Sequence, residues 1–192
     1  GVPGGTALST YTGPCTITAD NTVIEAKVIN CGLTIQATNV TVSRSIVNGA
    51  VYGREDASFT VADSEVVLPV GGDTVVSRSN FTVLRSEIRG GRRGVSCTHN
   101  FVVQDSWIHG QDIPADSDWH GSGMRASQDV RFIHNTIACD VTDTPTGGCS
   151  ANITMYGDFE PVQRVLIQDN LFLASKAGYC SYGGSSPGKA YS

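Results

Sequence analysis

The stretch NFVVQDSWIH, residues 100–109, decides the fold because its pattern occurs six times along the chain. The other five copies begin at Asn39, Ser58, Asn80, Asp129 and Arg164. The first apolar residues of successive copies lie 19, 22, 20, 29 and 35 residues apart. The three shorter spacings are typical of a repeat that forms one coil of a solenoid. The two longer spacings predict insertions in the later coils.

Apolar residues alternate within each copy, which predicts a strand with one buried face. In the quoted stretch these residues are Phe101 and Val103, and Ile108 marks a second buried strand. A small polar residue follows the first strand in every copy and predicts a tight turn in which the copies stack. These residues are Ser45, Ser64, Ser86, Ser106, Asn135 and Asn170.

The residue just before this small polar position alternates in charge from copy to copy. The series is Arg44, Asp63, Arg85, Asp105, His134 and Asp169. If the copies stack at the usual strand spacing of about 4.8 Å, each charge lies beside an opposite one. His134 is therefore interpreted as part of a surface charge ladder and not as a catalyst.

A third short strand is predicted before each copy, best seen at residues 73–76, 94–96, 123–125 and 152–155. Three short strands in a coil of about twenty residues predict an all-β fold, the single-stranded right-handed parallel β-helix. Residues 1–20 lack the repeat and are expected to form an N-terminal cap, followed by the β-helix domain at 21–184. Residues 185–192 are interpreted as a tail or the start of a further coil. An open last coil would favour self-association or docking of another chain.

Composition and cysteines limit the environment and the partners. The net charge of −5 argues against a nucleic-acid partner, and no apolar run reaches the ~20 residues that span a bilayer. Cys15 and Cys31, and Cys139 and Cys149, bracket short segments and are expected to form disulfides; Cys97 and Cys180 are a possible third pair. Disulfides indicate a secreted, extracellular protein. Six free thiols in a cytosolic protein are the alternative.

Departures from the repeat gather between the second and third strands of successive coils, in the loops 89–94, 110–122 and 139–151. Stacked coils would place these loops side by side, walling a groove along the third strand. The catalytic candidates are His120, Asp116, Asp118 and Arg125. The substrate-binding candidates are Arg92, Arg93, Trp119, Tyr156, Asp158 and, as a secondary candidate, His109.

Each of these residue types has a use on a polysaccharide. Arginine binds a uronate carboxylate through paired hydrogen bonds, and tryptophan and tyrosine offer flat faces to sugars. His120 can transfer a proton. The carboxylates of Asp116 and Asp118 suit acid–base hydrolysis, or, with Asp112, a Ca²⁺ site as the possible cofactor. Ordinary turn chemistry is the alternative interpretation of these aspartates.

Several motifs resemble the pectate-lyase-like superfamily of parallel β-helix proteins, in particular secreted, largely uncharacterised bacterial members. They are DSDWHGSGMR at 116–125, VRFIHNTI at 130–137, GGCS at 147–150 and GYCSYGG at 178–184. The resemblance implies a polysaccharide cleft in a comparable position and lyase or glycoside hydrolase activity. The chain lacks the Asn-Thr-Asp…Asp-Asp set of polygalacturonases and the lysine and arginine series of well-characterised pectate lyases. A non-catalytic glycan-binding module and a structural β-solenoid remain the alternatives.

Overall fold

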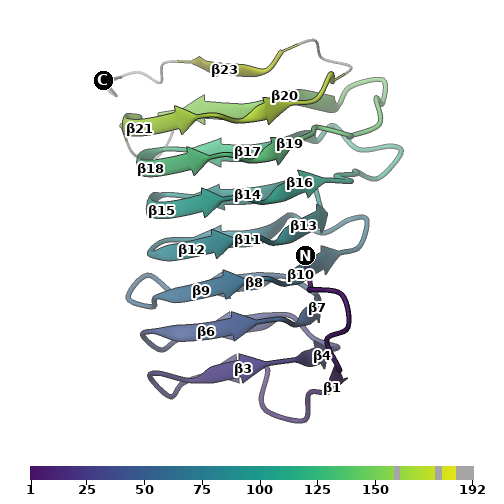
Figure 1. Cartoon of the computed structure of the whole chain (residues 1–192). Coiled ribbons are helices and arrows are strands. Elements are labelled where there is room, and N and C mark those ends of the chain that lie inside the picture. Colours follow the sequence, from purple (N-terminus) through teal and green to yellow (C-terminus); the bar gives the residue numbers. More distant parts are fainter. Residues whose placement is uncertain (158–160, 176–178, 185–192) are drawn as a thin grey trace.

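The chain folds into a right-handed parallel β-helix with three sheets, as the repeat predicted (Figure 1). The structure, a computed structural model, describes residues 1–157, 161–175 and 179–184. Every strand pairs in parallel with strands of the neighbouring coils. No helix in the described residues is long and apolar enough to cross a membrane.

Each coil supplies one strand to each sheet. Sheet A consists of β1 (Ser9–Thr10), β4 (Lys27–Ile29), β7 (Ile46–Asn48), β10 (Glu65–Leu68), β13 (Glu87–Gly90), β16 (Trp107–His109), β19 (Thr136–Ile137) and β22 (Leu171–Phe172). Sheet B consists of β2 (Thr16–Ile17), β5 (Leu33–Ile35), β8 (Val51–Gly53), β11 (Thr74–Arg78), β14 (Arg93–Cys97), β17 (His120–Ala126), β20 (Gly148–Tyr156) and β23 (Ser181–Gly184). Sheet C consists of β3 (Val23–Glu25), β6 (Val40–Ser43), β9 (Phe59–Ala62), β12 (Phe81–Leu84), β15 (His99–Gln104), β18 (Gln128–Ile133) and β21 (Gln163–Gln168).

The core is a column of like residues stacked from coil to coil. The rings of Phe59, Phe81, Phe101 and Phe132 follow one another at centroid distances of 5.1, 5.0 and 5.4 Å. Such contacts between aromatic rings stabilise a core beyond the burial of their area. Because each coil repeats the same inward positions, the register of the sheets is fixed along the solenoid.

The small polar residue of each copy lies inside the turn between sheets C and A. The Ser86 hydroxyl accepts a hydrogen bond from the Ser64 backbone N–H at 3.2 Å and donates one to Leu84 O at 2.7 Å. In the same way, a backbone N–H donates to the small polar side chain of the following coil at Ser45, Ser86, Ser106 and Asn135. These bonds satisfy backbone groups that the turn would otherwise bury without partners, which explains the polar residue in every copy.

The predicted charge ladder forms in part, as separate pairs: Arg44 pairs with Glu25 instead of Asp63, and among the described residues no ion pair joins Arg85 to Asp105. Arg85 pairs with Asp63 at 2.7 Å, and His134 Nδ1 lies 2.6 Å from Asp105 Oδ1, while Arg44 pairs with Glu25 of the preceding coil at 2.8 Å. The hydrogen bond from Arg85 lowers the pKa of Asp63, and the bond from His134 lowers that of Asp105. The interpretation of His134 as part of this ladder is confirmed.

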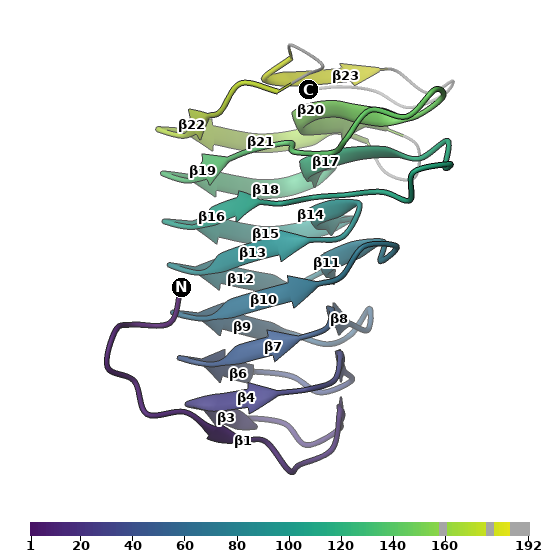
Figure 2. The same ribbon diagram turned by 90° about the vertical axis from the view of Figure 1, so that its right-hand side faces the viewer.

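The first twenty residues already take part in the sheets. Within them β1 pairs with β4 and β2 pairs with β5, so the coil series begins inside the segment that was expected to be a cap. Residues before β1 run along the outside of later coils, and the Gly1 amine donates a hydrogen bond to Arg85 O at 2.8 Å. Figure 2 shows the N-terminus beside β10.

Candidate functional site: a groove on sheet B

Three connections stand side by side at one edge of sheet B. They join β13 to β14, β16 to β17 and β19 to β20. The first, predicted as the loop 89–94, is only a two-residue turn at 91–92, because residues 89–90 end β13 and residues 93–94 begin β14. Hydrogen bonds join each loop to the next: Asp112 N to Gly91 O at 2.9 Å, Thr144 Oγ1 to Ser117 O at 2.8 Å. The two longer loops project from the same side of the solenoid in Figure 2. The predicted wall of a groove is therefore present.

The longer loops have a small core of their own. Ile113 and Val141 are buried against the Cys139–Cys149 disulfide, and Trp119 packs on the same cluster. Gly121 allows this close approach, since a Cβ there would lie 2.3 Å from a Val141 methyl group. The wall is thus a packed structure and not a pair of loose loops.

Beside this wall sheet B is hollowed. A cavity of about 300 Å³ is lined by Arg93, His120, Gly121, Ser122, Arg125, Ser150, Thr154 and Tyr156. Arg93 and Arg125 also line a larger hollow of about 690 Å³ that continues along the sheet toward the N-terminal coils. Four of the predicted site residues (Arg93, His120, Arg125 and Tyr156) are therefore brought together in one cavity.

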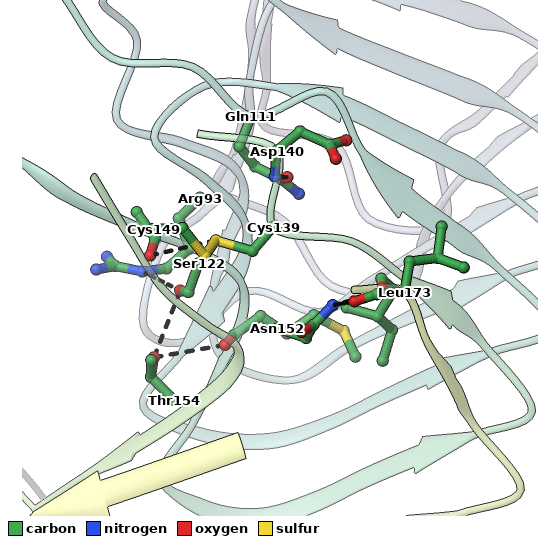
Figure 3. The surroundings of a disulfide bond; sticks show 12 residues. Arg93, Gln111, Ser122, Cys139, Asp140, Cys149, Asn152, Thr154 and Leu173 are labelled. Carbon is green, nitrogen blue, oxygen red and sulfur yellow. Dashed lines mark hydrogen bonds between the residues drawn. A yellow bond between two sulfur atoms is a disulfide. The ribbon is translucent and has the colours of Figure 1, made fainter. Parts of the chain in front are cut away.

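Arg93 is half-buried in the lining of this cavity. Its Nε donates a hydrogen bond to Ser122 Oγ at 3.1 Å, and Ser122 also accepts one from Thr154 (Figure 3). Burial is the main cause that lowers its pKa, to about 10, and repulsion from Arg92 and Arg125 adds to the effect. Among the described residues no carboxylate lies within ion-pair distance of its guanidinium.

Arg92 and Trp119 contact each other at the rim. The Arg92 guanidinium lies 5.0 Å from the centre of the Trp119 ring and forms an ion pair with Asp73 at 2.7 Å. One cation thus joins three successive loops. We interpret this contact as support for the groove wall, although the sequence suggested that both side chains bind substrate.

The candidate acids do not join His120. Asp116 and Asp118 are exposed in the β16–β17 loop, and no carboxylate of the described residues lines the cavity around His120. Asp112 accepts a hydrogen bond from the adjacent Ile113 N–H. In the described part of the chain no three His, Cys, Asp or Glu side chains are close enough to hold a metal. The carboxylates of Asp112, Asp116 and Asp118 thus do not form a three-ligand cluster in the structure, and the suggested Ca²⁺ site stays a prediction.

His109 lies on a different face of the solenoid. It belongs to β16 of sheet A, where its Nε2 is 2.8 Å from Glu87 Oε1 and its ring stacks on Trp107 at 3.6 Å. The prediction that His109 contributes to the groove is wrong, because its strand precedes the loop that turns the chain onto sheet B. Asp158 lies outside the described residues.

Two of the expected disulfides are present, Cys15–Cys31 and Cys139–Cys149. Cys180 is a free, exposed cysteine, so the possible pairing with Cys97 is wrong. Cys97 ends β14, whereas Cys180 precedes β23, and β17 and β20 lie between these two strands. Strands three positions apart, at about 4.8 Å per step, are too distant for a disulfide.

Sequence reasoning missed two residues of the larger hollow, Tyr52 and Arg78. Arg78 Nε donates a hydrogen bond to the Tyr52 hydroxyl at 3.0 Å, and the guanidinium lies over the ring at 5.1 Å. Tyr52 occupies the same outward column of sheet B as Arg125. An alignment of the third strands could have placed Tyr52 and Arg125 in one column. The connections before these strands differ in length, so the sequence alone does not reveal that alignment.

No protein-family model matches this chain, and neither a curated protein nor a solved structure does. The groove itself is therefore the basis for inferring a function.

Proposed function

We propose that this chain is a secreted member of the pectate-lyase-like superfamily that binds an acidic polysaccharide in the groove of sheet B and cleaves it. Arg93 is the observation that carries the proposal. A charged guanidinium is costly to bury without an anionic partner, and a uronate carboxylate would supply two charge-assisted hydrogen bonds. The two disulfides are compatible with an extracellular protein.

The lining of the cavity supports elimination over hydrolysis. Hydrolysis of a glycosidic bond generally uses a pair of carboxylates, and the described residues around His120 supply none. In an elimination, Arg93 and Arg125 would neutralise the uronate carboxylate and make the adjacent C5 proton more acidic. His120 would take that proton, and its electrons would form the C4–C5 double bond as the C4–O bond breaks. The leaving oxygen would receive a proton from Tyr156 or from water.

A non-catalytic glycan-binding module is the second candidate. No hydrogen bond within the described part of the chain orients the His120 ring, whereas catalytic bases are usually oriented by a partner. Binding alone would need only the arginines, the tyrosine and the hydroxyls of the cavity.

The test is to incubate the protein with acidic polysaccharides (polygalacturonate, alginate and hyaluronate) and with neutral ones. Absorbance of unsaturated uronates and the release of reducing ends are then recorded, and binding is measured separately by calorimetry. We expect unsaturated products from one of the acidic polymers. His120→Gln should lower kcat by about a hundredfold or more with binding retained, since general base catalysis commonly contributes that much. Arg93→Met should weaken binding by roughly tenfold or more.

Arg131→Gln, on the exposed face of sheet C, removes the same charge away from the groove and is the matched control. Binding of an acidic polymer without any product would support the non-catalytic module. Absence of binding to every acidic polymer would contradict both candidates.

A further inference from the structure

Sheet B carries a second arginine–tyrosine pair at a distance from His120. The Arg78 guanidinium lies over the Tyr52 ring at 5.1 Å, much as Arg125 lies over Tyr156 at 5.6 Å. Tyr52 and Arg78 line the larger hollow together with Arg93 and Arg125, so both pairs face one continuous depression. The groove therefore offers two similar contacts for a ligand.

The separation of the two pairs follows from strand register. Tyr52, Ser77, Ser96 and Arg125 occupy one outward column, each on the strand next to the previous one. Three strand spacings of about 4.8 Å place Tyr52 roughly 14 Å from Arg125 along the groove. Only the small hydroxyl side chains of Ser77 and Ser96 lie between them in this column. Arg78, on β11, lies two strands from Arg125, on β17, so the backbone positions of the two arginines are separated by roughly 10 Å along the groove.

The backbone at Arg78 is unusual. Its φ of 96° differs from the other non-glycine residues with positive φ, which lie between 45° and 61°. A non-glycine residue outside the common regions is strained, and such strain tends to persist at functional sites. Apart from the Nε bond to Tyr52, the Arg78 side chain makes no other hydrogen bond or ion pair with the described residues. Its terminal nitrogens can therefore bind an anion.

The charges of the side chains along the hollow indicate where the anionic part of a bound ligand would end. From Arg78 to Arg125 the side chains that line it are mainly cationic or hydroxylated, and Asp73 is already paired with Arg92. Beyond Arg78 the adjoining cavity of about 610 Å³ is lined by Arg54, Glu55 and Asp56, so the charges there are mixed.

We propose that Arg78 and Tyr52 form a second carboxylate-binding subsite, which holds an acidic oligosaccharide whose other end lies at Arg93 and Arg125. The subsite sets the shortest chain that the groove binds tightly. This inference rests on the proposed function, and it adds a specificity determinant at a position where no reaction takes place.

The test is calorimetric titration of the protein with oligogalacturonates of increasing length, starting from the dimer. For the unmodified protein the affinity should rise once the oligomer spans both pairs. Arg78→Asn removes the cation, and asparagine tolerates a positive φ, so the fold should be retained. We expect this variant to bind long oligomers roughly tenfold more weakly, the effect of one charge-assisted hydrogen bond, and to bind the dimer as before.

Tyr52→Phe removes the hydroxyl that holds Arg78 Nε and should cause a smaller loss of the same kind, which keeps the idea testable if Arg78→Asn folds poorly. Arg131→Gln should leave both affinities unchanged. Equal loss for the dimer and the long oligomers, or no loss at all in Arg78→Asn and Tyr52→Phe, would overturn the second subsite while leaving the proposed function standing. Failure of the unmodified protein to bind any acidic oligomer or polymer would overturn the proposed function, and the subsite with it.

Discussion

Arg93 is a charged side chain in an unfavourable place. Burial lowers its pKa to about 10, which corresponds to a cost on the order of 3 kcal/mol at neutral pH, where the guanidinium is charged in both the folded and the unfolded chain. Because the folded pKa lies below the unfolded one, this cost disappears only as the pH rises through about 10 toward the ordinary pKa of arginine. Binding residues commonly reduce stability in this way.

Replacing Arg93 by methionine, which has a similar shape and no charge, should therefore leave the free energy of unfolding unchanged or raise it by about 1 kcal/mol. The lost hydrogen bond to Ser122 offsets part of the gain. Urea denaturation at neutral pH measures the change, while uronate binding by the same variant should be weakened. A loss of more than about 1 kcal/mol would show that Arg93 stabilises the fold instead of preparing a binding site.

The two disulfides lie on different elements, so variants that lack one or the other should differ in ligand binding and in stability. Cys139–Cys149 closes the β19–β20 loop, whose Gly148 N–H donates a hydrogen bond to Trp119 O beside His120. Cys15–Cys31 joins the coils of β2 and β5, away from the cavity around His120. Replacing Cys139 and Cys149 by serine should weaken uronate binding, since the wall loses its tether.

Replacing Cys15 and Cys31 by serine should leave binding unchanged and lower the free energy of unfolding by about 2–3 kcal/mol, the usual effect of opening such a loop. Calorimetry and urea denaturation on the same two variants compare the effects. Equal binding by both variants would mean that the loop core of Ile113 and Val141 holds the wall without its disulfide.

The strands could be predicted from the sequence because equivalent positions in successive coils carry similar residues that pack in the same way. Phe101 and Ser106 occupy positions that every neighbouring coil repeats, so one alignment determined strands, turns and charge pairs together. The site was less predictable, since the loops follow no repeat. His109 was named as a secondary binding candidate although it lies on sheet A, and the Tyr52–Arg78 contact depends on register across loops of different length.

At the scale of the whole molecule the two ends of the solenoid differ. Ile24, in the first strand of sheet C, is 3% exposed, whereas Ile167, at an inward position of the last, is 36% exposed. In the described part of the chain, β21 and β3 each have a neighbouring strand on one side only, so the ends of sheet C differ in how far their inward residues are covered. A parallel strand edge next to an open core is a surface that other strands can join.

This asymmetry predicts how the chain opens. Contacts in a solenoid are between neighbouring coils, so a coil with one neighbour should open more readily than a coil with two. Amide hydrogen exchange followed by mass spectrometry should be fastest in β21 and β22 and slowest in the central strands β12 and β13.

The expected self-association through the last coil stays a prediction, and the same experiment tests it. If copies associate there, raising the protein concentration tenfold should slow exchange in β21 and β22 alone. Uniform exchange along the solenoid would contradict an open C-terminal end, and exchange independent of concentration would contradict the association.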